Sequence, residues 1–324
     1  MAEIRYLKAI NEALSDAMSA DPTVILMGED VGEAGGPFGA SRGLRDKFGP
    51  ARVLDTPISE AALAGAAVGA ALSGLKPVLE IMFMDFTTLV MDAMVNQAAK
   101  ARFMFGGQGS VPMVLRTPHG GGLGAGPQHS QCLEAWFAHV PGLKVVCPSD
   151  PASAYGLLRA AIEDPDPVVF IEHKALYAMK AEVPEVLPVL PLGKPATLRE
   201  GRDVTLVAYG AAVHTCLSAA KTLAAEGIEA EVIDLRSIQP WDEAAVLASL
   251  SKTHRLVVVH EAVEAFGVGA EIVARMADVG FDELDAPIVR VAAPFMPVPF
   301  SKGLEAAYIP SPERVIAAVR RTLA

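Results

Sequence analysis

The sequence around one carboxylate, Glu60, suits a role in proton transfer. Glu60 follows Pro57–Ile58–Ser59 and begins a run of small, uncharged residues that lasts through Gly74. Apolar surroundings raise the pKa of a carboxyl group that has no partner, and a carboxyl group that shares a proton can act on a ring nitrogen. The alternative is that Glu60 only complements a helix dipole in the first turn, an effect of about 0.3–1 kcal/mol.

One histidine follows the most glycine-rich segment of the chain. His129 lies in Gln128–His129–Ser130–Gln131, directly after Gly120–Gly126. Glycines allow the backbone to approach a ligand closely, so a histidine there could donate a proton or orient a substrate. A hydrogen-bonded structural histidine is the alternative. Neither Glu60 nor His129 alone indicates a particular reaction.

Several common catalytic motifs are absent from the sequence. It contains no GxxxxGK[ST] phosphate-binding loop, no GxSxG nucleophile elbow and no HExxH helix. The glycines of Gly120–Gly126 do not have the spacing of a dinucleotide-binding loop, and no His, Cys and carboxylate cluster has zinc-like spacing. An ordinary hydrolase, kinase or nicotinamide-dependent enzyme is therefore poorly supported.

Alternating strands and helices must position these side chains in the first part of the chain. The expected strands are Val24–Met27, Val53–Leu54, Pro77–Phe83, Val111–Arg116, Leu143–Cys147 and Pro167–Ile171. The expected helices are Met1–Asp16, Glu60–Leu72 with Ser59 as N-cap, Thr88–Ala101 and Ala152–Ala161. This alternation predicts an α/β fold with a parallel sheet and helical crossovers.

A proline-rich segment divides the chain, and the same alternation begins again after it. Pro184–Pro195 contains four prolines in 12 residues and predicts a stiff, extended linker. Later strands are expected at Val204–Tyr209, Ala230–Asp234, Leu256–His260 and Ile288–Val291, and later helices at Ala211–Ala225, Asp242–Ser251, Val268–Val279 and Ser311–Leu323. We therefore predict a first α/β domain at 1–183, a linker at 184–200 and a second, smaller α/β domain at 201–324.

Two glycines interrupt the helix that begins at Glu60. Gly65 and Gly69 lie four residues apart among alanines, and glycine is a poor helix former. Their presence indicates that another backbone packs very close. One interpretation is tight packing under the sheet, and the other is a helix crossing at a subunit interface; the sequence does not choose between them.

Composition restricts the class of protein. The 324 residues suggest two domains, and 52% hydrophobic residues exclude disorder. A net charge of −11 argues against a nucleic-acid partner or an anionic membrane surface. The three cysteines have no CxxC spacing, which fits a reducing compartment, and no segment has the pattern of a signal peptide or a membrane span. We expect a soluble, cytoplasmic protein.

Ordered motifs throughout the chain resemble one enzyme family. They are Asp55–Glu60, Gln97–Lys100, Ala125–Gln131, Pro141–Val146, Asp166–Val169, Leu235–Asp242 and Phe266–Glu271. Together they resemble the beta subunit of the thiamine-diphosphate-dependent decarboxylating component of 2-oxoacid dehydrogenase complexes. Pyruvate, branched-chain 2-oxoacid and acetoin dehydrogenases share this subunit. The resemblance implies a pyrimidine-type cofactor-binding domain followed by a transketolase C-terminal-like domain.

The resemblance also implies partners. Family members are heterotetramers of two alpha and two beta subunits with thiamine diphosphate at the alpha–beta interface. The alpha subunit carries the GDG motif that holds the diphosphate through Mg²⁺, and this sequence has no such motif, since Gly28–Glu29–Asp30 lacks the second glycine. We therefore expect this chain to supply only the aminopyrimidine half of the site, to be inactive without an alpha subunit and to serve a lipoyl acyltransferase core.

Site residues follow from the resemblance position by position. Glu60 matches the glutamate that hydrogen-bonds N1′ of the aminopyrimidine and thereby favours the tautomer whose 4′-nitrogen removes the C2 proton. Phe86 matches the aromatic side chain that packs on the pyrimidine ring, and Met82 matches a neighbouring apolar wall, although both could be ordinary core residues. His129 matches the histidine that serves acyl transfer to a lipoyl arm.

The family's beta subunits also hold a structural potassium ion, mostly through backbone carbonyls. The matching positions are Met113, Ala161, Ile162, Asp164 and Asp166. Hard oxygen ligands suit such an ion, but the same residues could simply form a helix-to-strand turn.

No catalytic group is expected in the C-terminal domain. There, His260, Glu261 and Glu264 are candidates for a subunit interface or for surface salt bridges.

The sequence does not decide between the substrates of two related reactions. Glu172–Tyr177 and Met104–Gly107 look more like acetoin dehydrogenase beta subunits, whereas Gln131–Trp136 fits pyruvate dehydrogenase equally well. We favour a pyruvate-type 2-oxoacid substrate, with acetoin as the alternative. A single-chain transketolase-like enzyme would need a diphosphate-binding domain that this length does not hold. A non-catalytic scaffold subunit is the remaining alternative from another class.

Overall fold

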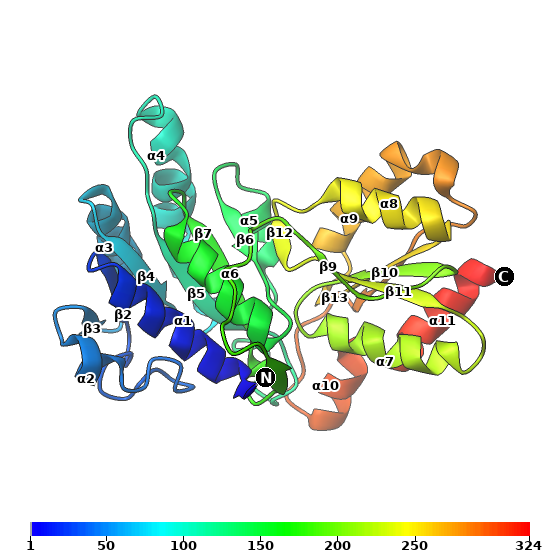
Figure 1. The fold of residues 1–324 in the computed structure, drawn as a ribbon, viewed down its shortest axis with the longest axis horizontal. Coiled ribbons are helices and arrows are strands. Elements are labelled where there is room, and N and C mark those ends of the chain that lie inside the picture. The colour runs from blue at the N-terminus through cyan, green and yellow to red at the C-terminus, as the bar shows by residue number, and fades with distance from the viewer. Residues whose placement is uncertain (1) are drawn as a thin grey trace. The chain divides into compact units, whose positions relative to one another are not determined.

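The computed structural model describes residues 2–324; Met1, the first residue of the predicted domain 1–183, lies outside the described residues. Two compact units make up the chain (Figure 1). Unit 1 contains the described residues up to His119 together with Trp136–Leu192, and unit 2 contains Gly120–Ala135 and Gly193–Ala324. The predicted first domain included residues 120–135, which the structure groups with unit 2 because side chains of unit 2 hold them.

A parallel sheet forms the centre of unit 1. Its strands lie in the order β6-β7-β5-β4-β2-β3 and all pair in parallel. Their bounds are β2 (Val24–Gly28), β3 (Val53–Asp55), β4 (Lys76–Glu80), β5 (Val114–His119), β6 (Lys144–Val146) and β7 (Val168–His173). Strands β2, β5 and β7 are buried throughout, as expected for inner strands of a parallel sheet that is covered on both faces.

Helices cover this sheet. They are α1 (Tyr6–Ala20), α2 (Leu44–Phe48), α3 (Glu60–Leu72), α4 (Ala99–Met104) and α6 (Pro151–Glu163), with 3-10 turns η1 (Met84–Val90) and η3 (Lys174–Leu176), a π-helical segment η2 (Asp92–Ala98), and α5 (Glu134–Ala138) across the boundary between the two chain segments. Helix α6 packs on α1. It begins with a capping box in which the Asp150 carboxylate accepts a hydrogen bond from the Ser153 N–H at 2.9 Å.

The first residues differ from the predicted helix over Met1–Asp16. Strand β1 (Ala2–Arg5) comes first and pairs antiparallel with β8 (Lys180–Val183), and α1 begins only at Tyr6. This pairing joins segments that are far apart in the sequence. Local periodicity gives no indication of such a distant partner. For this reason a helix was expected where the structure has a strand.

The expected helix at Thr88–Ala101 is also different in the structure. Successive 3-10, π and α segments replace it, from η1 through η2 to α4. The hydroxyls of Thr87 and Thr88 donate hydrogen bonds to the carbonyls of Met84 and Asp85, three residues earlier, at 2.6 and 3.2 Å. Such local bonds compete with the α-helical ladder and favour the tighter 3-10 turn.

The glycines of α3 face outward. A Cβ atom built on Gly65 or Gly69 would meet no other heavy atom within 4 Å, and both residues are exposed. Ala61 and Ala66 lie on the same exposed face. Tight packing of the glycines under the sheet is therefore wrong for this chain, and an interface with another helix is the interpretation that their exposure permits.

Unit 2 contains a second, smaller sheet in the order β14-β13-β10-β11-β9. The strands are β9 (Ala196–Arg199), β10 (Val204–Ala208), β11 (Ala230–Asp234), β13 (Leu256–Val263) and β14 (Val289–Ala293), and the remaining elements are the short strand β12 (Ser237–Gln239), the 3-10 turn η4 (Phe281–Glu283) and the helices α7 (Ala212–Ala224), α8 (Glu243–Thr253), α9 (Val268–Val279), α10 (Lys302–Tyr308) and α11 (Pro312–Leu323). Only β9 is antiparallel to its neighbour. It lies within the predicted linker 184–200, which is therefore not extended coil throughout.

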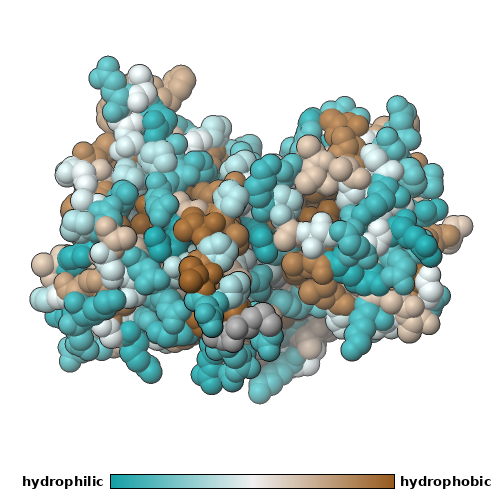
Figure 2. All heavy atoms as spheres, in the orientation of Figure 1, coloured by the Kyte–Doolittle hydropathy of each residue, from teal (hydrophilic) through white to brown (hydrophobic). Residues whose placement is uncertain are grey.

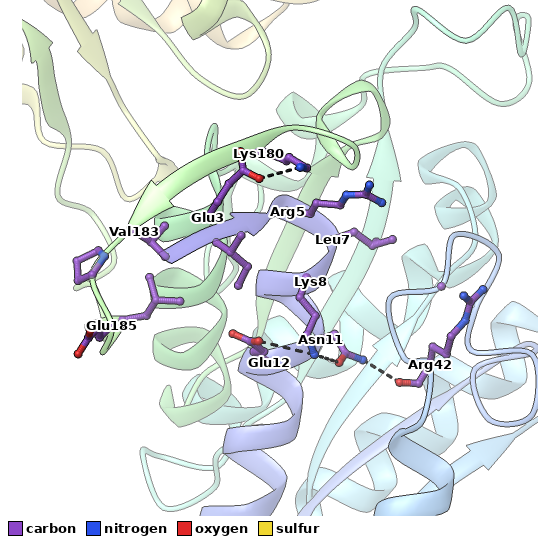
Figure 3. Close-up of a pocket in the computed structure, with 14 residues that line it drawn as sticks. Glu3, Arg5, Leu7, Lys8, Asn11, Glu12, Arg42, Lys180, Val183 and Glu185 are labelled. Carbon is purple, nitrogen blue, oxygen red and sulfur yellow. Dashed lines mark hydrogen bonds and ion pairs between the residues drawn. The ribbon is translucent and has the colours of Figure 1, made fainter. Parts of the chain in front are cut away.

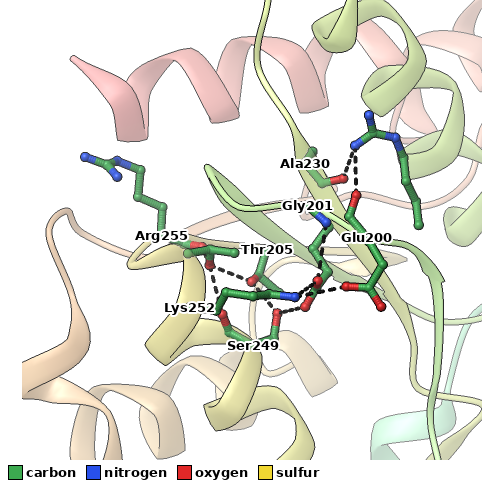
Figure 4. Close-up of polar contacts among 10 residues, drawn as sticks. Glu200, Gly201, Thr205, Ala230, Ser249, Lys252 and Arg255 are labelled. Carbon is green, nitrogen blue, oxygen red and sulfur yellow. Dashed lines mark hydrogen bonds and ion pairs between the residues drawn. The ribbon is translucent and has the colours of Figure 1, made fainter.

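Buried hydroxyls fasten α8 to the sheet of unit 2 (Figure 4). The Thr205 hydroxyl lies 2.6 Å from that of Ser249 and 2.7 Å from that of Thr253. Ser249 donates to the Glu231 carboxylate at 2.5 Å, and Lys252 pairs with the same carboxylate. Because every polar group in this layer has a partner, it stabilises the domain and is not a candidate site.

Neither unit provides a membrane span. Among the described residues, no helix combines the length and the apolar character that crossing a bilayer requires.

Candidate functional site

The order of strands in unit 1 creates a topological switch point between β2 and β4. From β2 the chain continues to β3 on one side, and then crosses to β4 on the other side. Ligands of open α/β sheets bind beyond the carboxyl ends of the strands at such a point. Glu29 follows β2, Glu60 follows β3, and Met82 follows β4. The sheet therefore brings residues from three separate segments to one edge.

Close backbone contacts fix these strand ends. A Cβ atom on Gly28 would lie 2.8 Å from the carbonyl oxygen of Glu80 in β4, so only glycine fits at the end of β2. The Thr56 N–H donates to the Gly28 carbonyl at 3.1 Å, which sets the direction of the chain as it leaves β3. Glu60 then begins α3 four residues later.

Glu60 occupies the position that the sequence predicted, at the first residue of α3. It is only 8% exposed, although the alanines that follow it are exposed. Ser59 is the N-cap residue, but its side chain makes no capping hydrogen bond. Helix α3 packs on β4 and η1; Met82 lies between these two elements, and Phe86 lies in η1.

A second carboxylate, Glu29, was missed by the sequence analysis. It is 7% exposed, and its Oε1 atom is buried with no hydrogen-bond partner. Burial and the neighbouring carboxylate of Glu60 raise the pKa of Glu29, while a hydrogen bond from the Ser59 backbone opposes this shift. A pair of nearby carboxyl groups favours retaining one proton between them. The available signal was an acidic residue directly after a buried strand.

Met82 and Phe86 lie in the same unit as Glu60, and both are half-buried. The Phe86 ring packs edge-to-face on Phe83 with centroids 5.7 Å apart, and the Phe86 N–H donates to the Phe83 carbonyl at 3.0 Å. Phe83 in turn packs edge-to-face on Phe38 at 5.8 Å. These contacts hold the apolar wall in one orientation, which suits a flat ring as ligand.

The loop after β2 is tied to the end of β3. The Asp55 carboxylate accepts hydrogen bonds from the Gly32 and Glu33 N–H groups at 2.6 and 3.2 Å, and pairs with Arg45 at 2.7 Å. From this loop Phe38 reaches both Phe83 and Tyr177. The loop therefore supports the apolar wall and carries Glu29 at its beginning.

A buried ion group joins β4, β5 and β7, and it was not predicted from the sequence. Arg116 pairs with Glu80 at 2.5 Å and with Glu172 through two hydrogen bonds at 2.6 and 2.9 Å. Tyr177 donates to the same Glu172 carboxylate at 2.8 Å. Burial raises the pKa of Glu80, although Arg116 opposes the shift. Glu172 and Tyr177 are therefore members of a buried hydrogen-bonded network within the sheet.

His129 belongs to unit 2. It is half-buried, and its backbone N–H donates to the carbonyl of Gly126 at 3.4 Å, which closes a turn after the glycine-rich segment. Glu60, Met82 and Phe86 all belong to unit 1. The side chain of His129 is thus presented by a turn rather than by a regular element.

The predicted potassium ligands lie together around the end of α6. The Asp164 carboxylate binds Lys144 Nζ at 2.7 and 2.6 Å and accepts the Asp166 N–H at 2.9 Å, and Asp166 pairs with Arg102. Ala161 and Ile162 lie in the last turn of α6, and the Met113 carbonyl accepts the Val168 N–H at 3.0 Å. Because residue 165 is proline, the Ala161 carbonyl lacks its usual helical donor.

A groove in unit 1 lies away from the predicted site residues (Figure 3). Its volume is about 880 Å³, and it is lined by residues of β1, α1 and β8, including Arg5 and Lys8, and by Arg42 from the loop before α2. Ion pairs such as Lys180 with Glu3 at 2.7 Å already neutralise part of its charge. None of the predicted site residues lines this groove.

Comparisons with known proteins identify the two domains of the chain. Residues 2–180 match the family "Transketolase, pyrimidine binding domain", and residues 193–315 match "Transketolase, C-terminal domain". A solved structure described as "Split gene transketolase, inactive beta4 tetramer" covers 99% of this chain and 98% of its own, with a TM-score of 0.80 and 25% identity. The predicted two-domain α/β fold is therefore confirmed.

Similar proteins show to which members of this family the chain is related. The chain is 49% identical to the pyruvate dehydrogenase E1 component subunit beta-2, mitochondrial, of Oryza sativa subsp. japonica, over 98% of this chain and 86% of the relative. It is 51% identical to the acetoin:2,6-dichlorophenolindophenol oxidoreductase subunit beta of Bacillus subtilis (strain 168), over 95% and 94%. The chain thus belongs to the transketolase family and, within it, to the beta subunits of pyruvate and acetoin dehydrogenases.

Proposed function

We propose that this chain is the beta subunit of a thiamine-diphosphate-dependent 2-oxoacid dehydrogenase of pyruvate type. With an alpha subunit, it decarboxylates the 2-oxoacid and passes the acyl group to a lipoyl arm. The observation that carries the proposal is the pair of buried carboxyl groups, Glu29 and Glu60, at the switch point of the parallel sheet. Acetoin cleavage with the same cofactor is the second candidate, because the Bacillus subtilis relative is as similar as the pyruvate dehydrogenase subunits.

The residues at the switch point fit the aminopyrimidine ring of thiamine diphosphate. Such a ring needs an apolar surface on its face and a carboxyl partner at its ring nitrogen. Met82 and Phe86 offer half-buried apolar side chains, and Glu60 offers the carboxyl group. The partnerless oxygen of Glu29 indicates that this region has unused capacity for a polar ligand. When bound, the cofactor supplies the electron sink that decarboxylation requires.

Each chain residue then has a distinct task. Glu60 holds a proton at the ring nitrogen, in surroundings where low polarity strengthens the hydrogen bond. Glu29, whose pKa is raised, keeps a proton close to Glu60 when the pair changes its charge. Phe86 and Met82 orient the ring and exclude water. His129 donates or accepts the proton at the acyl group during transfer to the lipoyl arm.

Exposed apolar side chains support the proposed alpha partner. Figure 2 shows hydrophobic residues gathered in several places on the visible surface. Phe103 is 89% exposed, Met104 is 71% exposed, and the small-residue face of α3 is also uncovered. Exposed apolar surface of this extent marks protein interfaces. In the proposed heterotetramer the alpha subunit holds the diphosphate through Mg²⁺, and a lipoyl acyltransferase core receives the acyl group.

The turn after α6 is proposed as the potassium site. The open carbonyl of Ala161, with its neighbour Ile162 and the carbonyl of Met113, would supply hard oxygen ligands. Lys144 and Arg102 hold the carboxylates of Asp164 and Asp166 and thereby shape the turn.

The cellular location stays a prediction. The cytoplasm is expected from the sequence, whereas several relatives are named as mitochondrial proteins.

Co-expression with an alpha subunit tests the proposal. The assembled enzyme should release CO₂ from pyruvate only when thiamine diphosphate and Mg²⁺ are added. It should convert acetoin more slowly than pyruvate, or not at all. Faster turnover of acetoin would select the second candidate. Cofactor-dependent decarboxylation by the beta chain alone would contradict the need for two subunits, and absence of cofactor binding by the assembly would contradict the proposed function.

A further inference from the structure

The glycine-rich segment that carries His129 is held by side chains of the C-terminal domain. Residues 120–135 belong to unit 2, although they are separated from the rest of that unit by more than fifty residues of unit 1. From the sequence, no catalytic group was expected in the C-terminal domain. Two glutamates of this domain nevertheless bind the backbone of the segment that carries His129.

Glu261 and Glu305 both bind the backbone of this segment. Glu261, at the end region of β13, accepts a hydrogen bond from the Gly121 N–H at 2.5 Å. Glu305, in α10, accepts one from the Gly124 N–H at 2.9 Å. The two carboxylates are only 7% and 2% exposed. A hydrogen bond from a backbone N–H to a buried carboxylate is stronger than one between neutral groups.

The two carboxylates converge on one glycine. A Cβ atom on Gly121 would lie 3.1 Å from Glu305 Oε1 and 3.5 Å from Glu261 Oε1. Placing two acidic groups this close in a buried region is costly, and apolar residues would fill the same space at lower cost. Their use here indicates that the position of the segment, rather than stability alone, is what these side chains determine.

Further contacts hold the rest of the segment. A Cβ atom on Gly126 would overlap the Phe300 ring, so the ring packs directly on the backbone three residues before His129. Beyond His129, the Tyr209 hydroxyl donates to the buried Glu134 carboxylate at 2.7 Å. The C-terminal domain therefore contacts the segment on both sides of His129.

We propose that Glu261 and Glu305 are positioning residues for His129, and that through them the C-terminal domain controls acyl transfer to the lipoyl arm. This inference rests on the proposed function. Because the two glutamates act through the Gly121 and Gly124 N–H groups, their loss displaces the turn that presents His129. A displacement of about 1 Å at a reacting group can lower a rate by about 100-fold. The contacts of Glu60 with the aminopyrimidine are in unit 1 and are not affected.

The test uses the holoenzyme assembled with its alpha subunit. Two rates are measured: decarboxylation of pyruvate with an artificial electron acceptor, and reductive acylation of lipoamide. The variants are Glu261→Ala and Glu305→Ala, with Glu261→Gln and Glu305→Gln as conservative replacements whose amide oxygen can still accept the backbone N–H. Glu226→Gln is the matched control, because this exposed glutamate also belongs to unit 2 but pairs with Arg320 instead.

We expect both alanine variants to lower acylation of lipoamide by about 10- to 100-fold while decarboxylation stays within about twofold of the unmodified enzyme. The glutamine variants should recover most of the acylation rate, and Glu226→Gln should change neither rate. Equal loss of both rates, or no loss of either, would overturn the inference. If an alanine variant does not assemble, Gly121→Ala, which pushes on both carboxylates, gives the same comparison. An unmodified holoenzyme without cofactor-dependent decarboxylation would instead refute the proposed function.

Discussion

The switch point of unit 1 and the glycine-rich segment of unit 2 position functional residues in different ways. At the switch point, Glu29, Glu60 and Met82 each follow the carboxyl end of a neighbouring parallel strand. In the glycine-rich segment, the backbone is held by Glu261 and Glu305, which lie 140 and 181 positions away from the glycines they bind. A repeating strand topology therefore assembles the first region, whereas individual long-range hydrogen bonds assemble the second.

The difference explains which residues the sequence could identify. Parallel strands deliver their carboxyl ends to one edge of the sheet, so a polar residue after a predicted strand is already a candidate. No such rule connects a glycine-rich loop to carboxylates in another domain. Mutations in the two regions should therefore separate the two halves of the reaction.

The largest effect is expected for Glu60→Gln in unit 1. A glutamine cannot share a proton with the ring nitrogen, so exchange of the cofactor's C2 proton and decarboxylation should fall by about 10²- to 10⁴-fold. The melting temperature should stay unchanged, because an amide fits the same space. Exposed Glu33→Gln in the neighbouring loop is the control. Unchanged C2 proton exchange in the assembled Glu60→Gln enzyme would remove Glu60 from the site.

Arg116→Leu should break the support beneath the switch point. Removing the guanidinium leaves the buried carboxylates of Glu80 and Glu172 without their cation, which we expect to cost about 3–5 kcal/mol of the free energy of unfolding. Chemical denaturation measures this loss. Arg320→Ala, which removes an exposed pair with Glu226, should cost less than about 1 kcal/mol. Similar losses for both variants would contradict the buried ion group.

Glu29→Gln should separate stability from activity at the switch point. Because the pKa of Glu29 is raised in the folded state, the folded chain binds more protons than the unfolded chain above pH 4.5. Stability therefore decreases as the pH rises through the folded-state pKa, and the cost of the ionised group persists at pH 7. Glu29→Gln should raise the melting temperature at pH 7 by about 2–4 °C for each kcal/mol recovered, and should still lower decarboxylation. A lower melting temperature would contradict this assignment.

The smallest effect is expected for His260→Gln in unit 2. Burial lowers the pKa of His260 below its ordinary value of 6.5, and its ring stacks on Tyr209 with an interplanar angle of 7°. The unfolded chain therefore binds the proton first, so stability decreases as the pH falls below about 6.5. In His260→Gln the decrease in melting temperature between pH 7 and pH 5 should be smaller. Half-exposed His254→Gln should keep the full decrease.

Several elements could be predicted from local pattern because their cause is local. Helix α9 (Val268–Val279) and strand β11 (Ala230–Asp234) have the predicted bounds, and α3 begins at Glu60 as expected. Each combines a clear apolar period with a terminating signal. Strands β1 and β9 were missed because each is defined by a partner distant in the sequence, β8 and β11 respectively.

The sequence by itself determined the family, the α/β class and the position of Glu60, because short motifs and apolar periodicity carry this information along the chain. Only the tertiary structure decided that the charge of Glu60 acts on Glu29, that Arg116 joins Glu80 to Glu172, and that Glu261 holds the segment of His129. These contacts join residues from separate strands and segments. They depend on sheet order and on burial, which raises the energetic importance of each charge and each hydrogen bond beyond what residue type alone indicates.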